Sequence, residues 1–250
     1  MDYRLVFEEY ETARRFLGKL DSHFYKLCDG HSYSLQNAYE ECVEEGSSSY
    51  LVQEIEGQYS RTDYPQVFKS IEYIQDAQVK SMKQSDLKPM TQKELLNVSF
   101  YKGGHSVLAD AFLVKPDLTS DDMQFAFQYG AFLQLIDDLQ DVKEDIRSKN
   151  RTYFNFKTTP SESDVKVEKL ITYLFEVNDI NDTDSTKQKI IKTVIRSSSL
   201  LLIMEAVSKN QSYISSDFYA TLETYSKVRL SFYNKVQKEV QPLLNKWFSK

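Results

Sequence analysis

Apolar residues recur at spacings of three and four positions through most of the 250-residue chain. This spacing places them on one side of an α-helix and is typical of amphipathic helices. Glycine and proline are scarce, at seven and five residues, which favours long helices over many short strands. The pattern predicts an all-α bundle of roughly nine helices, over residues 3–27, 33–45, 49–60, 64–84, 91–113, 120–148, 162–178, 185–208 and 215–247.

Local start signals support several of these helices. Thr91 with Glu94, and Thr119 with Asp122, have the form of capping boxes, in which a hydroxyl and a carboxylate three residues later each bond a free backbone N–H. Pro65 stands where the first turn of a helix tolerates proline. Breaks are predicted at residues 45–49, 115–120, 157–163 and 178–184. No linker-like shift in composition divides the chain, so we expect one domain over residues 1–250.

Composition and charge narrow the functional classes. The net charge of −6 argues against a general nucleic-acid binder, which needs a basic face for phosphates. Cys28 and Cys42 form no disulfide framework and suit a reducing compartment. The N-terminus is too charged for a secretory signal, and the longest apolar run, residues 200–204, is too short to span a bilayer. We therefore expect a cytoplasmic protein that binds no nucleic acid and has no transmembrane segment.

The segment LQLIDDLQDVKED, residues 133–145, concentrates carboxylates in a helix-forming stretch. Because each helical residue advances about 100°, residues four apart nearly realign, so Asp137, Asp141 and Asp145 should form a line along one face. Asp138 and Glu144 flank that line. Magnesium takes oxygen ligands, usually one or two carboxylates with substrate phosphates and water. The line is thus a candidate site for magnesium ions held against a diphosphate, and the alternative is a solvated acidic face.

The residues just upstream favour a site over a solvated face. In FAFQYGAFLQL, residues 125–135, apolar side chains occupy nearly the whole circumference of the predicted helix. Such a helix is buried on most sides. Carboxylates carried into the interior on it need cations to offset their desolvation.

These residues also carry a family resemblance. Gly130-x-x-x-Gln134-x-x-Asp137-Asp138-x-x-Asp141 resembles the second aspartate-rich motif of trans-polyprenyl diphosphate synthases. Asp141-Val-Lys-Glu144-Asp145, followed by Arg151-Thr-Tyr153, resembles the second motif and trailing Arg-x-Tyr of squalene and phytoene synthases. Terpene cyclases also place their second set of metal ligands at successive steps of four. Over about residues 91–156 the sequence is similar to the class I isoprenoid synthase superfamily.

The resemblance implies a fold, a reaction and a set of roles. It implies helices around a central apolar cavity, Mg²⁺ as cofactor, and ionisation of an allylic prenyl diphosphate followed by coupling or cyclisation. The helix 95–114 resembles the one that precedes the motif in chain-elongating prenyl synthases, where a lysine binds diphosphate. The implied roles are Asp137, Asp141 and Asp145 as catalytic magnesium ligands, Asp138 and Glu144 as assisting ligands, Lys102, Arg151 and Tyr153 as diphosphate ligands, and Gln134 as a cavity-lining residue.

Two glycines follow Lys102 inside the same predicted helix. Each costs on the order of 1 kcal/mol relative to alanine, so Gly103 and Gly104 indicate a kink or a close backbone approach. Under the alternative reading, the pair is a packing notch beside an exposed lysine. His105 is expected to be an ordinary packing residue. For Arg151 and Tyr153, the alternative is that they merely anchor a loop.

Members of the superfamily carry a first aspartate-rich motif far upstream of the second, which would place it at or before Met1 in this chain. Residues 1–60 contain no good match to it. The chain is then a shortened homologue, a fragment of a longer product, or an enzyme with different ligands on the first wall. Three hypotheses stay open: an enzyme, a non-catalytic homologue that binds a prenyl lipid or a complete partner subunit, and a structural helical protein. A homodimer is among the states left open.

Overall fold

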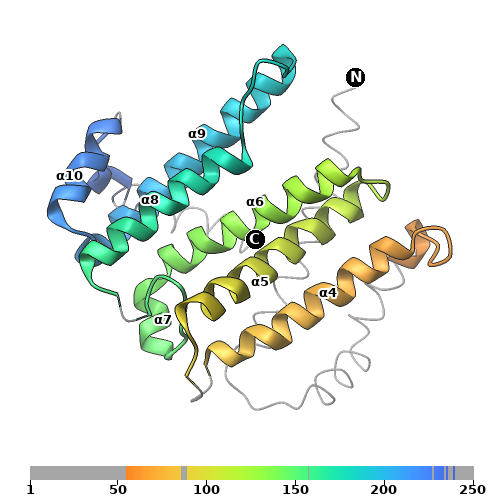
Figure 1. The fold of residues 1–250 in the computed structure, drawn as a ribbon, viewed down its shortest axis with the longest axis horizontal. Coiled ribbons are helices and arrows are strands. Elements are labelled where there is room, and N and C mark those ends of the chain that lie inside the picture. Colours follow the sequence, from red (N-terminus) through yellow and green to blue (C-terminus); the bar gives the residue numbers. More distant parts are fainter. Residues whose placement is uncertain are drawn as a thin grey trace. The chain divides into compact units, whose positions relative to one another are not determined.

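The computed structural model describes residues 55–85, 89–156, 158–226, 228–233, 235 and 239. No strand occurs in these ranges, so the prediction of an all-α fold is confirmed. Within them, no helix is long and apolar enough to cross a membrane. The helices predicted at 3–27 and 33–45, the first half of that at 49–60, and both cysteines lie outside the described residues. The elements, labelled in Figure 1, are α4 (Pro65–Ser81), η1 (Met82–Gln84), α5 (Gln92–Val114), α6 (Ser120–Gln140), α7 (Val142–Ser148), α8 (Pro160–Val177), α9 (Thr186–Lys209), η2 (Gln211–Tyr213) and α10 (Ser216–Tyr225).

The chain divides into two compact units. The described part of the first comprises residues 55–70 and 110–117. There the Tyr59 hydroxyl donates to the carbonyl of Leu113 at 2.6 Å, and the Gln66 amide donates to the carbonyl of Pro116 at 2.8 Å. The second unit takes in residues 71–109 and 118–250 and contains the acidic segment. Whether the chain acts as one domain stays a prediction.

The predicted helix starts are confirmed where they carry capping signals. The Glu94 carboxylate accepts from the Thr91 N–H at 2.7 Å, and the Thr91 hydroxyl accepts from the Glu94 N–H at 3.2 Å. Thr119 and Asp122 form the same reciprocal pair at the start of α6, and Pro65 is the first residue of α4. The sequence therefore determines these starts locally, through side chains that satisfy the free N–H groups of the first turn.

Three predicted helix boundaries are wrong. The helix expected at 120–148 is interrupted at Asp141, whose φ of −100° and ψ of 14° are not helical. The helix expected at 215–247 is interrupted after Tyr225, where Ser226 is extended, and residues 230–233 are helical again. Helix α8 begins at Pro160, two residues before the predicted start. Its start signal is a capping box between Thr159 and Glu162 with proline in the first turn.

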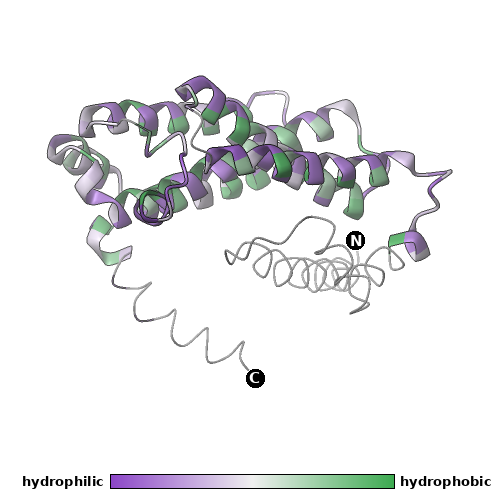
Figure 2. Ribbon diagram, turned by 90° about the horizontal axis from the view of Figure 1, so that it is seen from below, coloured by the Kyte–Doolittle hydropathy of each residue, from purple (hydrophilic) through white to green (hydrophobic). Residues whose placement is uncertain are grey.

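The core of the second unit lies among α6, α8 and α9. Helix α6 buries the consecutive residues Gly130, Ala131 and Phe132, which span about 200° of its circumference, so the prediction that it is buried on most sides is confirmed. Figure 2 shows apolar positions recurring along the described helices. Burying one large apolar side chain contributes about 1.5–3 kcal/mol, and the fully buried ones here include Phe132, Leu139, Leu174, Ile203 and Val207.

Helices α5 and α6 come into backbone contact at two glycines. A Cβ added to Gly103 would overlap the carbonyl oxygen of Gly130 and lie 2.5 Å from Cβ of Gln134. A Cβ added to Gly130 would overlap the carbonyl oxygen of Gly103 and lie 2.8 Å from Cβ of Val107. The close approach predicted from the glycine pair is therefore confirmed, and α5 continues through it without a break. This crossing brings α5 alongside the acidic end of α6.

His105 packs in an aromatic cluster, as the sequence indicated. Its ring lies 4.9 Å from Tyr73, 4.4 Å from Tyr101 and 5.2 Å from Phe127, measured between ring centroids. Burial is the main cause that lowers the pKa of His105. The imidazole thus acts as a packing group between α4, α5 and α6.

Candidate functional site

The acidic line lies across the junction of α6 and α7. Asp141 ends α6 and directly precedes Val142, the first residue of α7. The backbone N–H of Asp141 donates to the Asp137 carbonyl at 2.9 Å, and that of Asp145 donates to the Asp141 carbonyl at 2.8 Å. These two bonds keep the helical connection between residues four apart. The three carboxylates therefore stay one turn apart although the helix is interrupted.

Asn210, at the end of α9, holds this junction. The residue is fully buried, and its side-chain amide donates to the carbonyls of Leu139 at 2.6 Å and Gln140 at 3.0 Å. Lys209 adds an ion pair, with 3.0 Å between its Nζ and Oδ1 of Asp141. Sequence reasoning missed Asn210. Its place directly after a helix is a cap signal, but the carbonyls that it serves lie on another helix.

The three carboxylates act on one another electrostatically. Burial is the largest cause that raises the pKa of Asp137, and the charge of Asp141 raises it further. Burial raises the pKa of Asp145 to about 6, and the charges of Asp141 and Asp137 act in the same direction. Such mutual effects need charges close enough to interact through a partly desolvated medium. The line predicted from the four-residue spacing is thus one electrostatic cluster.

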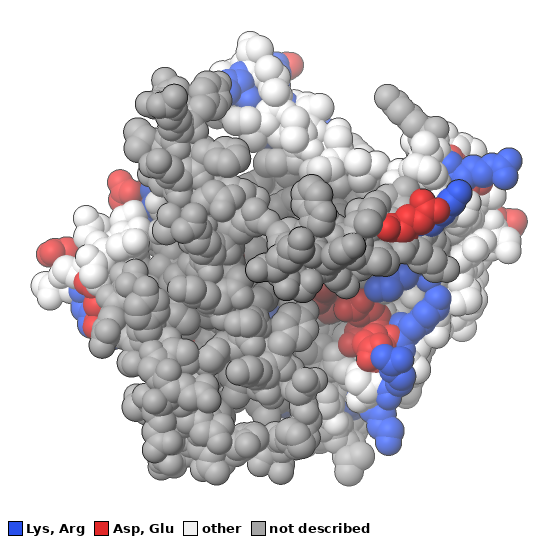
Figure 3. All heavy atoms as spheres, turned by 180° about the vertical axis from the view of Figure 1, so that it is seen from behind, with Lys and Arg blue, Asp and Glu red and all other residues white. Residues whose placement is uncertain are grey.

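Lys102 belongs to the same cluster. Its positive charge lowers the pKa of Asp137, Asp138 and Asp145, against the effect of burial. It stands one residue before Gly103, where α5 contacts α6. The close helix crossing therefore places a half-buried lysine within electrostatic range of the acidic line. In Figure 3, acidic and basic side chains gather next to one another on one face.

Asp138 is hydrogen-bonded to α5, and Gln134 is hydrogen-bonded both to Asp138 and to the acidic line. Asp138 is 5% exposed and accepts from the Ser99 hydroxyl at 2.5 Å and from the Gln134 amide at 2.9 Å. Burial raises the pKa of Asp138 to about 6, although both hydrogen bonds oppose that rise. The Gln134 amide also donates to Asp137 at 3.2 Å. Gln134 is thus a bridge between two carboxylates, and its cavity-lining role stays a prediction.

Glu144 stands apart from the line. It is exposed and pairs with Arg147 one turn later on α7, and this hydrogen bond is the main cause that lowers the pKa of Glu144. Asp145, in contrast, accepts from the Asn150 amide at 2.9 Å. An assisting metal-ligand role for Glu144 stays a prediction, and its ion pair would first have to open.

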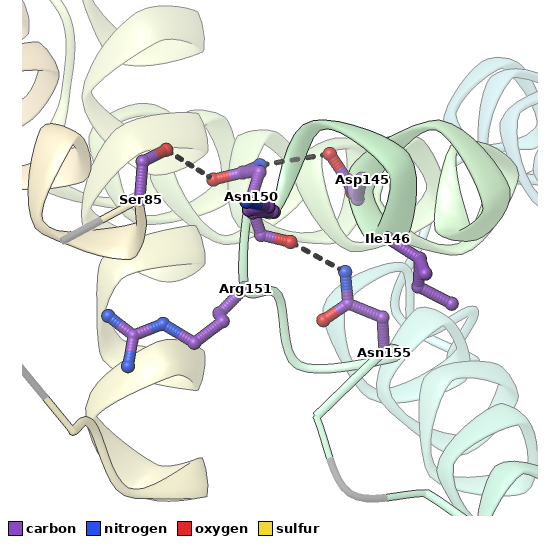
Figure 4. Close-up of a pocket in the computed structure, with 7 residues that line it drawn as sticks. Ser85, Asp145, Ile146, Asn150, Arg151 and Asn155 are labelled. Atoms are coloured by element: carbon purple, nitrogen blue, oxygen red, sulfur yellow. Dashed lines mark hydrogen bonds between the residues drawn. The ribbon is translucent and has the colours of Figure 1, made fainter. Parts of the chain in front are cut away.

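A pocket of about 400 Å³, lined mainly by residues with polar side chains, adjoins Asp145. In Figure 4, Ser85, Asn150 and Asp145 form a hydrogen-bonded chain along it, and the Asn155 amide donates to the carbonyl of Asn150 at 2.7 Å. Lys149, which ends α7 in a left-handed conformation, Arg151 and Ile146 complete the lining. Two basic residues and one acidic residue thus line the pocket. It is not the apolar cavity implied by the resemblance, which stays a prediction.

Arg151 and Tyr153, in the loop that follows α7, both contact other groups of the protein. The Arg151 guanidinium donates to the carbonyls of Gln84 at 3.0 Å and Lys83 at 3.2 Å, and in Figure 4 it points away from Asp145. Tyr153 packs edge-on against Phe154 at 5.3 Å between ring centroids, and burial raises the pKa of its hydroxyl. These contacts are those of loop anchors. The predicted diphosphate roles would need Arg151 to turn toward the pocket.

The acidic line has the right donor chemistry for magnesium but not a complete protein ligand set. Within residues 55–239, as far as they are described, no group of three or more His, Cys, Asp or Glu side chains could hold a metal ion. Magnesium is usually bound by one or two carboxylates, with phosphate oxygens and water filling the other positions. A magnesium site on this line would therefore depend on a phosphorylated ligand.

Comparisons of the chain with protein-family models, with curated proteins and with solved structures yield no match. The resemblance to the isoprenoid synthases thus depends on the motif residues alone.

Proposed function

We propose that Asp137, Asp141 and Asp145 bind Mg²⁺ together with the diphosphate group of an allylic prenyl diphosphate. The protein would then ionise this substrate before coupling or cyclisation. The observation that carries the proposal is that burial and the charge of Asp141 raise the pKa of Asp137 and of Asp145 in a partly desolvated site with Lys102 nearby. Perturbed pKa values of this kind cluster at functional sites, because the charges that cause them are arranged for a ligand.

Four basic residues of the chain would have different roles in binding the diphosphate. Lys102 would offset negative charge beside the acidic line, and Lys209 would release Asp141 when a metal ion binds there. Lys149 and Arg151, on the pocket that Asp145 also lines, would bind the outer phosphate, Arg151 through a bidentate contact. Bound magnesium supplies electrophilic assistance to the leaving diphosphate.

A second candidate is a non-catalytic homologue that binds the same ligand or a complete partner subunit. One observation favours it: within the described residues, no three His, Cys, Asp or Glu side chains are placed so that together they could hold a metal ion. Ionisation of an allylic diphosphate relies on preorganised cations around the leaving group, whereas binding tolerates fewer of them. Binding without turnover would then be the function. The cytoplasmic location stays a prediction under either candidate.

The test is release of pyrophosphate from geranyl, farnesyl and geranylgeranyl diphosphates, with and without Mg²⁺. The diagnostic variant is Asp137→Asn/Asp141→Asn. The matched control is Glu168→Gln/Glu176→Gln, which removes two exposed carboxylates from α8. Release that needs magnesium and is lost only in the diagnostic variant supports the enzyme. A rise in melting temperature with Mg²⁺ and a prenyl diphosphate, but no release, supports the non-catalytic homologue. Neither effect, from folded protein, overturns both and leaves a solvated acidic face.

A further inference from the structure

A lysine of the chain forms an ion pair at the middle of the acidic line. Nζ of Lys209 lies 3.0 Å from Oδ1 of Asp141, the second of the three carboxylates. The charge of Lys209 also lowers the pKa of Asp137 and of Glu144, so its effect extends beyond its direct partner. A metal ion that binds Asp141 must therefore compete with this ammonium group.

Backbone contacts hold Lys209 next to the acidic line. Lys209 is the last residue of α9, and its carbonyl accepts from Nζ of Lys143 on α7 at 2.7 Å. The following residue, Asn210, is fully buried and donates to the carbonyls of the last two residues of α6. The end of α9 is thus attached to both helices that meet at Asp141. The fold therefore keeps the Lys209 ammonium group within reach of the line, whether or not it is paired with Asp141.

The ion pair is exposed enough to open. The side chains of Lys209 and Asp141 are 39% and 45% exposed. Ion pairs with this much access to solvent are weak, because water competes for both charges. A lysine side chain is also long and flexible, so Nζ can leave Asp141 while the backbone stays in place. The pair can therefore open without any rearrangement of the helices.

A metal ion alone and a metal ion with diphosphate meet different electrostatic conditions at this pair. A divalent cation that binds Asp141 alone displaces the lysine and leaves two cations close together, which repel each other. A diphosphate adds negative charge beside the metal ion, and a lysine ammonium group is a good partner for phosphate oxygens. The displaced Lys209 then exchanges a carboxylate for a phosphate. The metal–diphosphate complex is thus bound with less repulsion than the metal ion by itself.

We propose that Lys209 makes metal binding at the acidic line depend on diphosphate. Its ammonium group neutralises Asp141 in the ligand-free protein and transfers to a phosphate oxygen when the metal ion and diphosphate bind together. This role rests on the proposed function, since it requires that the acidic line binds a metal ion with diphosphate. Because coupling between two ligands is reciprocal, the metal ion raises the affinity for diphosphate by the same factor. The site then responds to the metal–diphosphate complex and rejects free metal ions.

The test measures binding of Mn²⁺ by electron paramagnetic resonance of the free ion, and binding of radiolabelled pyrophosphate by equilibrium dialysis with and without Mn²⁺. The native full chain is compared with Lys209→Gln, which removes the charge, and with Lys209→Arg, which keeps it. Lys169→Gln is the matched control, because Lys169 is an exposed lysine of α8. Far-ultraviolet circular dichroism of each variant verifies that it is folded.

The removal of the charge should change the two affinities in opposite directions. Lys209→Gln should bind Mn²⁺ alone about five- to tenfold more tightly than the native chain, because the competing cation is gone. In the presence of Mn²⁺ it should bind pyrophosphate about three- to tenfold more weakly, because one phosphate ligand is lost. Lys209→Arg and Lys169→Gln should behave like the native chain. A merely structural role of Lys209 at the end of α9 would weaken both kinds of binding.

Three results would overturn the role of Lys209 and leave the proposed function in place, provided that the native chain binds Mn²⁺ together with pyrophosphate. They are a Lys209→Gln chain that binds Mn²⁺ alone no more tightly than the native chain, a Lys209→Gln chain that binds both ligands more weakly, and a Lys209→Arg chain that behaves like Lys209→Gln. If neither the native chain nor Lys209→Gln binds Mn²⁺ or pyrophosphate under any of these conditions, both the role of Lys209 and the proposed function fail.

Discussion

In the described part of the second unit, two places where charge is desolvated differ in kind. One is the acidic line at the junction of α6 and α7. The other is Lys166 of α8, which is 4% exposed and whose pKa burial lowers to about 8. Its ammonium group donates to the Tyr153 carbonyl at 2.7 Å and to the Thr158 hydroxyl, and it lies 5.0 Å from the centroid of the Tyr153 ring.

The difference lies in what surrounds each charge. The Lys166 ammonium group contacts neutral groups of the loop that precedes α8, so the lysine holds that loop against the helix. In the acidic line, by contrast, the charge of Asp141 adds to burial in raising the pKa of Asp137 and of Asp145. A cluster of like charges destabilises the ligand-free protein until cations offset it. Repulsion between neighbouring carboxylates therefore distinguishes the acidic line, a candidate binding site, from Lys166, which has a structural role.

The largest expected effect comes from removing the residue that holds the acidic junction. Asn210→Ala deletes the donor to the carbonyls of Leu139 and Gln140 and leaves both buried without it. We expect the free energy of unfolding, measured in urea, to fall by about 2–3 kcal/mol. Asn97→Ala, at an exposed position of α5, is the control and should change little. Equal stabilities of Asn210→Ala and the native chain would show that the junction does not depend on Asn210.

Lys166 should give the protein a stability that rises at alkaline pH. Because its folded pKa of about 8 lies below the model-peptide value of 10.5, the unfolded chain binds more protons between these values. Raising the pH through that window therefore stabilises the native chain, by of the order of 2–3 kcal/mol in total. Lys166→Met should lack this rise. The measurement is the difference in unfolding free energy between the two chains at pH 7.5 and pH 10, and a constant difference would contradict the prediction.

The acidic line should give the opposite pH dependence. The folded pKa of Asp145, about 6, lies above the model value of 3.8, so the folded chain binds more protons between these values. Stability should fall as the pH rises through that window, by of the order of 1–2 kcal/mol for this residue. Asp145→Asn removes the contribution, and its amide oxygen can still accept from Asn150. The variant should be more stable than the native chain at pH 7 and equal to it below pH 4. A variant that is less stable at pH 7 would show that the carboxylate is stabilising.

The smallest effect is expected at Glu144. It is exposed and its ion pair with Arg147 is on the surface, where such pairs contribute little. Glu144→Gln should leave the melting temperature unchanged, and it should leave the response to magnesium and pyrophosphate unchanged as well. A lost response would place Glu144 among the metal ligands, as the family resemblance implies.

The sequence predicts what local chemistry determines. Capping residues mark the starts of α5 and α6, the four-residue spacing puts Asp137, Asp141 and Asp145 in one line, and Gly103 marks the close approach of α5 to α6. These features depend on neighbours within one or two turns, or on the absence of a side chain.

Features that depend on distant partners could not be predicted. The interruption at Asp141 is held by Asn210, whose amide bonds a carbonyl 71 residues earlier in the chain. For Arg151 the sequence left a phosphate ligand and a loop anchor open, and its guanidinium donates to the carbonyl of Gln84, 67 residues away. Periodicity gives the face on which a side chain lies, but it does not reveal which distant backbone group occupies that side chain.

The most direct test of the central claim is the melting temperature of the native chain and of Asp137→Asn/Asp141→Asn at pH 7.5. Each protein is measured alone, with Mg²⁺, with pyrophosphate, and with both. Binding to the folded state alone raises the melting temperature. We expect the native chain to rise only when both are present, and the variant to start higher and show no rise. A native chain that does not respond, or a variant that responds equally, would contradict the claim that this acidic line binds a metal–diphosphate ligand.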